Sequence, residues 1–191
     1  MKSVCLYPGG FKPPHAGHLY VANSLAKECI ELNVFIGQKD RDGITQELSY
    51  TIWNLFPLRD NIKIIKSVNK TPLIDAYDYV FNLKEEAYVA LITSNKENDK
   101  RNILFSENVE KYKSTPTKDG KYIYEGVKPK TILNICPLLY SDRTDYLNDQ
   151  PISSTVLRND LNNNDYINFK TNYIGLNENI IQKIYLLLKS Q

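Results

Sequence analysis

The sequence has little of what builds metal centres and disulfide frameworks. Among 191 residues there are two histidines and three cysteines. The cysteines, Cys5, Cys29 and Cys136, lie far apart and form no CxxC pair. Structural zinc sites and disulfide-stapled folds use closely spaced cysteines. We therefore expect neither, and unpaired thiols fit a reducing, cytoplasmic location.

Long apolar runs and an excess of one charge are also missing. No stretch approaches the about 18 apolar residues that suggest a membrane span, and the apolar run before Pro8 is too short for a signal peptide. The formal charge is only +2, with basic residues scattered among acids, whereas counterion-driven nucleic-acid binding needs a basic stripe. We expect neither a membrane nor a nucleic acid as partner. A composition that is 42% hydrophobic and 24% charged predicts a single globular domain over residues 1–191.

Strand and helix patterns alternate along the chain. Strands are predicted at residues 4–7, 33–37, 62–67, 87–93 and 131–136, and helices at 17–30, 47–56, 72–83, about 102–113, after 154, and at 178–189. This order predicts an α/β fold built from βαβ units: a Rossmann-like, doubly wound, mostly parallel sheet of about five strands with helices on both faces. In such sheets ligands bind at the carboxyl ends of the strands.

One segment interrupts the alternation. Residues 114–130 contain an Asp119-Gly120 pair beside the run KYIY, and this pattern predicts a hairpin or lid excursion. A solvated insertion and a contact surface for a macromolecule are the other interpretations.

Both histidines lie in one bend, PGGFKPPHAGH, directly after the first predicted strand. Gly9 and Gly10 permit positive φ and close approach of a ligand to the main chain. His15 and His18 are three positions apart at a helix start, where the N–H groups and the helix dipole favour an anion. Lys12 adds a positive charge, so the bend predicts a phosphate site. A structural role for the pair is the alternative. Metal ligation would need further ligands that are not nearby in the sequence.

A second polar segment, PISSTVLRNDL, follows the fifth predicted strand. Ser153, Ser154 and Thr155 stand at a predicted helix start, with Arg158 one turn later. Hydroxyl and N–H groups there can hold phosphate oxygens, and the guanidinium can neutralise their charge. The alternative is an ordinary helix cap followed by a surface arginine.

These two segments carry a resemblance to a known family. GGFKPPHAGH resembles the (H/T)xGH signature of the nucleotidylyltransferase superfamily, and ISSTVLR resembles its ISSTxxR signature. The first segment is close to the forms found in nicotinate- and nicotinamide-nucleotide adenylyltransferases. The resemblance implies transfer of a nucleoside monophosphate, AMP from ATP, to a phosphomonoester acceptor such as nicotinamide or nicotinate mononucleotide, with release of pyrophosphate.

The resemblance also implies roles for particular residues. His15 and His18 would contact the triphosphate, with Lys12 beside them on the strength of its charge. Main-chain contacts to the nucleotide would come from Gly9, Gly10 and Phe11, and contacts to the β- and γ-phosphates from Ser153, Ser154, Thr155 and Arg158. Mg²⁺ would be bound through the triphosphate, without a protein metal site.

Two other functions stay open at this point. A cytidylyltransferase acting on a phosphorylated alcohol or sugar would use the same chemistry. A nucleotide-binding sensor or scaffold without turnover would keep the site and lose the reaction. Trp53, the only tryptophan, lies in a predicted helix that could face the acceptor. Its indole could then stack on the pyridine ring of the acceptor, and the alternative is that Trp53 belongs to the core.

Overall fold

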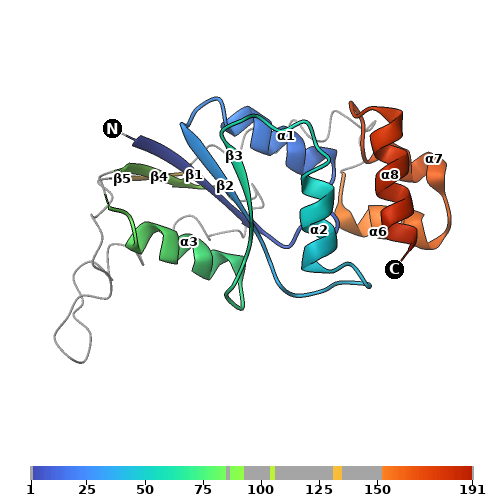
Figure 1. Cartoon of the computed structure of the whole chain (residues 1–191), viewed down its shortest axis with the longest axis horizontal. Coiled ribbons are helices and arrows are strands. Elements are labelled where there is room, and N and C mark those ends of the chain that lie inside the picture. Colours follow the sequence, from blue (N-terminus) through green and yellow to red (C-terminus); the bar gives the residue numbers. More distant parts are fainter. Residues whose placement is uncertain (1, 85–86, 93–103, 106–130, 135–151, 191) are drawn as a thin grey trace.

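The computed structural model describes residues 2–84, 87–92, 104–105, 131–134 and 152–190 (Figure 1). The predicted excursion at 114–130, Cys136, and the predicted helix at 102–113 apart from its residues 104 and 105 lie outside these ranges. Within them every helix is too short or too polar to span a bilayer.

The fold is α/β, with a parallel sheet flanked by helices. The strands are β1 (Lys2–Gly9), β2 (Glu31–Ile36), β3 (Ile62–Lys66), β4 (Ala87–Leu91) and β5 (Thr131–Asn134). They lie in the order β3-β2-β1-β4-β5, and each neighbouring pair is parallel. The chain therefore winds outward from β1 in one direction and then returns to its other side. That reversal places the end of β1 where such sheets bind ligands.

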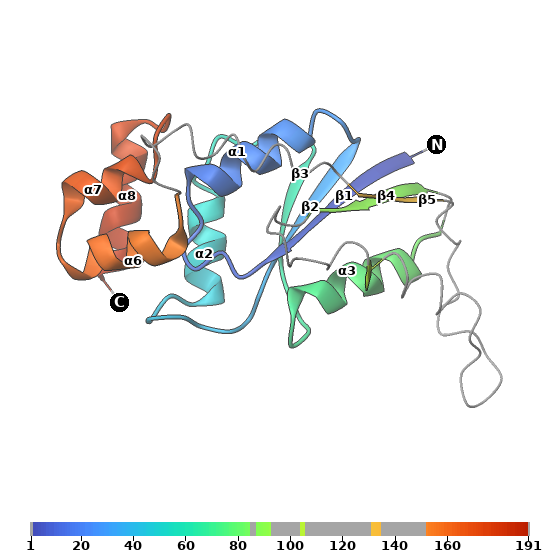
Figure 2. The ribbon, with the colours of Figure 1, turned by 180° about the vertical axis from the view of Figure 1, so that it is seen from behind.

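The helices cover both faces of this sheet. They are α1 (Ala16–Leu25), α2 (Gln46–Trp53), α3 (Pro72–Phe81), α6 (Ser154–Asn162), α7 (Tyr166–Thr171) and α8 (Glu178–Lys189). Helices α1 and α2 lie on one face and α3 on the other, and α6, α7 and α8 gather at the end toward which β1 runs (Figures 1 and 2).

Side chains of β1 alternate between two hydrophobic cores, as the period of two in a strand requires. Val4 and Leu6 belong to the core under α3, and Cys5 and Tyr7 to the core under α1 and α2. The second core continues into the C-terminal helices. Leu157, Leu161, Phe169, Tyr173, Ile181, Ile184 and Leu188 are buried in it. Helices α6, α7 and α8 thus complete the layer that α1 and α2 begin.

Several predicted boundaries are wrong by a few residues. The first strand continues through Pro8 and Gly9, which lie opposite Phe35 and Ile36 of β2, because the fixed φ of proline is compatible with an extended chain. Helix α1 ends at Leu25, five residues early, since the chain turns there. The N–H of Ile30 then donates to the carbonyl of Ser3 and starts the next strand pair. Helix α7 was not predicted.

Candidate functional site

The histidine loop, residues 10–18, comprises the connection from β1 to α1 and the first residues of α1. His15 is the N-cap of α1, and the imidazole rings of His15 and His18 stack with centroids 3.6 Å apart. The N–H of His15 donates to Nδ1 of His18 over 3.3 Å. A neutral imidazole that accepts at Nδ1 carries its proton on Nε2. His18, which is half-buried, is therefore set up as an Nε2–H donor.

Phe11, rather than either neighbouring glycine, takes the left-handed backbone conformation in this loop. Its φ is +51°, whereas Gly9 and Gly10 do not lie in the left-handed region. The Phe11 ring packs edge-on against Tyr7, His18 and Trp53, with centroid distances of 5.1, 4.9 and 5.3 Å respectively. Gly9 lies beneath this ring, where a Cβ would be 2.5 Å from Phe11 Cζ. The two glycines permit positive φ but do not adopt it here, and Gly9 is needed to make room for Phe11.

Lys12 is a buried cation at the end of β1. The residue is only 3% exposed, and its Nζ donates to the carbonyl of Gly37 over 3.0 Å. Burial lowers the pKa of Lys12 to about 8, and the nearby Asp40 carboxylate partly opposes that shift. An ammonium group has three N–H donors, and the bond to Gly37 uses one of them.

The second predicted segment binds directly to the histidine loop. Ser154 Oγ donates to the carbonyl of Pro13 over 2.9 Å, and Nη1 of Arg158 donates to the carbonyl of Lys12 over 2.8 Å. These contacts join residues more than 140 positions apart. The structure therefore brings together the two segments that the sequence analysis singled out.

The remaining polar groups of this segment also have protein partners. Ser153 is the N-cap of α6, and its Oγ accepts from the N–H of Val156, as the alternative helix-cap interpretation predicted. Exposed Thr155 accepts from Nη2 of Arg158 over 3.3 Å. Arg158 is buried, at 8% exposed, and its Nε donates to Asp42. The alternative in which Arg158 is a plain surface residue is wrong.

The C-terminal helices hold the other end of the loop. Tyr173, fully buried, donates its hydroxyl to the carbonyl of Pro14 over 2.9 Å. The carbonyl of Asn172 accepts from the N–H of Ala16 over 3.0 Å. One of the N–H groups at the start of α1, which the sequence analysis left for an anion, therefore has a protein partner.

A positively charged cleft of about 330 Å³ opens beside the loop. Its walls come from the chain after β1, β2 and β3, together with Ser154 of α6. The cations of the described part of the chain that line it are Lys12, Lys39, Arg41 and Lys70. With Gly10 and Phe11 also in its wall, this cleft is the candidate site. Its charge and its place at the carboxyl ends of parallel strands suit phosphate groups.

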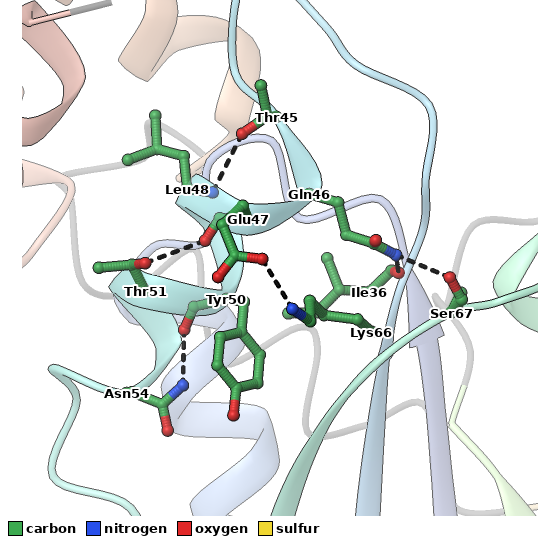
Figure 3. Close-up of polar contacts among 10 residues, drawn as sticks. All are labelled: Ile36, Thr45, Gln46, Glu47, Leu48, Tyr50, Thr51, Asn54, Lys66 and Ser67. Atoms are coloured by element: carbon green, nitrogen blue, oxygen red, sulfur yellow. Dashed lines mark hydrogen bonds and ion pairs between the residues drawn. The ribbon is translucent and has the colours of Figure 1, made fainter.

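Sequence reasoning missed one wall of this cleft. Lys39, Arg41 and Lys70 are exposed residues of polar loops, and in a sequence such residues resemble any solvated turn. Gln46 fixes the strand ends from which these loops leave. Its Nε2 donates to the carbonyls of Ile36 and Ser67 over 2.7 and 2.9 Å (Figure 3).

Trp53 has no exposed surface in the structure. Its ring packs edge-on against Phe11 and Phe56. The suggested stacking on an acceptor is therefore not available in this arrangement, because neighbouring rings and the core cover the indole. Trp53 supports Phe11, which in turn contacts His18.

A larger cavity of about 550 Å³ lies along the outer side of α1. It is lined mainly by apolar groups from α1, the chain after α2 and the chain before α8, and it contains none of the predicted site residues. Among the described residues, no group of three or more His, Cys, Asp or Glu side chains is arranged to hold a metal ion. Of the residues predicted for the site, Gly10, Phe11, Lys12 and Ser154 line the cationic cleft, which is therefore kept as the candidate site.

Compared with known proteins, the chain matches no protein-family model, and a search of curated proteins finds no match.

Proposed function

We propose that this chain is a nucleotidylyltransferase of Rossmann-like, doubly wound fold that transfers AMP from ATP to a small phosphomonoester. The proposal rests on one set of contacts: the segment with Ser154 and Arg158 is hydrogen-bonded to the main chain of the histidine loop, beside a cationic cleft. Nicotinamide or nicotinate mononucleotide is the acceptor that the sequence resemblance favours.

The proposed reaction needs no covalent enzyme intermediate and no general base. A phosphomonoester is already ionised near neutral pH, so one of its oxygens attacks the α-phosphorus in line. The bond from the α-phosphorus to the bridging oxygen breaks, and pyrophosphate leaves with the electron pair. The protein aligns the two reactants and stabilises the negative charge that accumulates.

Particular side chains have separate roles in binding the triphosphate. His15, His18 and Lys12 donate to the triphosphate. Ser154 lies in the cleft wall, and the N–H groups of Arg158 that are not bonded to described protein atoms serve phosphate oxygens. Mg²⁺ arrives as part of the substrate, coordinated by the triphosphate. Lys39, Arg41 and Lys70, which line the cleft, increase the positive potential that attracts both anionic substrates.

The test is release of pyrophosphate from ATP and magnesium in the presence of each mononucleotide. His18→Ala should cost about 3 kcal/mol of barrier, or about a hundredfold in rate, as for other oxyanion donors. Arg158→Ala should raise the KM for ATP more than it lowers kcat. An unchanged turnover number in His18→Ala would exclude its catalytic role.

Two further assays distinguish the proposed function from a cytidylyltransferase and from a nucleotide-binding protein without turnover. CTP with phosphorylated alcohols or sugars tests a cytidylyltransferase. Affinity for ATP without pyrophosphate release across the whole acceptor panel would instead indicate a binding protein without turnover.

A further inference from the structure

Asp42 lies in a hydrogen-bonded turn at the tip of the loop after β2. The N–H and C=O groups of Arg41 and Ile44 pair across this turn over 3.2 and 3.0 Å. Its two central residues, Asp42 and Gly43, have φ of +51° and +77°. This is the backbone of a two-residue hairpin turn, and Ile44 anchors it in the core at 2% exposed. The turn thus fixes the backbone of Asp42, and the side chain, 59% exposed, extends from it to Arg158.

The partner of Asp42 is the buried guanidinium of Arg158. Three kinds of partner surround that group: Asp42 on Nε, the carbonyl of Lys12 on Nη1, and Thr155 on Nη2. A guanidinium has five N–H donors in a fixed plane. Fixing one edge with a carboxylate and one nitrogen with a carbonyl sets the direction of the donors that remain. The same contact ties the loop that carries Lys39 and Arg41 to α6.

We infer that Asp42 is a positioning residue, which orients Arg158 on the histidine loop and holds the cationic loop of residues 37–45 against the site. The consequence for triphosphate binding rests on the proposed function. On charge alone, a carboxylate near a phosphate site repels the ligand, so its removal should tighten binding. A positioning role predicts weaker binding instead. Without the Asp42 carboxylate, Arg158 would lose its orientation and the loop would lose its attachment to α6.

The experiment compares Asp42→Asn with Asp60→Asn in the full-length chain. Asp60 is an exposed acid on the loop after α2, so both variants remove one negative charge. Binding of inorganic tripolyphosphate is measured by titration calorimetry. Asp42→Asn should weaken it about tenfold, the scale of a hydrogen bond to a charged group, whereas Asp60→Asn should leave it unchanged or slightly tighter. In an Arg158→Ala background the loss caused by Asp42→Asn should disappear. Equal or tighter binding by Asp42→Asn overturns the inference.

A readout without ligand keeps the inference separate from the proposed function. Amide hydrogen exchange of residues 38–45 should accelerate in Asp42→Asn and in Arg158→Ala but not in Asp60→Asn. Unchanged exchange in Asp42→Asn would show that the contact does not hold the loop, and the inference would fail. If exchange accelerates while the wild-type chain binds no tripolyphosphate, the loop attachment stands and the proposed function fails.

Discussion

Gly9→Ala should destabilise the chain by crowding the ring of Phe11. The added Cβ would lie 2.5, 2.8 and 2.9 Å from Phe11 Cζ, Cε2 and Cε1. The ring cannot swing away, because it is 5% exposed and packed edge-on against Tyr7, His18 and Trp53. Overpacking of this kind costs about 1–3 kcal/mol. For a chain of this length, a loss of about 2 kcal/mol corresponds to a Tm lower by about 4–8 °C.

The free energy of unfolding is measured in urea, and the Tm by calorimetry. Gly10→Ala is a matched control, since no described atom lies within 4 Å of a Cβ at position 10. That substitution should leave stability unchanged or slightly raised, because alanine restricts the unfolded chain. Shortening Phe11 to Leu in the Gly9→Ala chain should cost less than the same change in the wild type. Equal stability of Gly9→Ala and Gly10→Ala would refute the crowding described here.

Three further predictions concern the groups around the loop. With its pKa lowered to about 8, Lys12 loses its charge between pH 7 and pH 9, so calorimetry should show tripolyphosphate affinity falling over that range. The fall should be smaller in Lys12→Arg, whose guanidinium stays charged. An equal fall in both chains would show that Lys12 is not the group whose deprotonation weakens binding. Tyr173→Phe removes the hydrogen-bond donor of the buried Pro14 carbonyl, so it should lower the free energy of unfolding in urea by about 1–3 kcal/mol. Tyr166→Phe loses an exposed hydrogen bond and should lower it less. Equal losses in the two variants would count against the buried contact. Gln46→Glu replaces a shared donor with a carboxylate facing two carbonyls, so it should destabilise more than Gln46→Ala at pH 7 and recover at pH 5 as the carboxyl group is protonated. No difference between the two Gln46 variants at either pH would contradict that contact.

The order of elements could be predicted because local patterns determine it. Pro72 stands at the start of α3, and helix α8 has the predicted bounds of 178–189. Apolar spacing and terminal residues act over a few positions, and they can be read from the sequence alone. Where β1 ends depends instead on its partner strand, which is why the Pro8 boundary was missed.

The candidate site could be predicted only in part, for a related reason. Segments with unusual residues, such as the paired histidines, are visible in the sequence. Contacts between ordinary residues are not. The hydrogen bond of Arg158 to Asp42 spans 116 positions, and neither residue marks the other. The turn at Phe11 was missed because φ preferences favour glycine there, whereas packing against three neighbouring rings stabilises the aromatic residue.

The dependence of the histidine loop on the last forty residues has a consequence for biosynthesis. A chain leaving the ribosome exposes its first strand and the bend after it long before Ser154, Arg158 and Tyr173 are translated. Until then the carbonyls of residues 12–14 lack the donors that these side chains provide, and the apolar layer over α1 and α2 stays uncovered. The histidine loop therefore lacks these contacts until α6 and Tyr173 are made, and a nascent chain halted before α6 would expose apolar surface to chaperones.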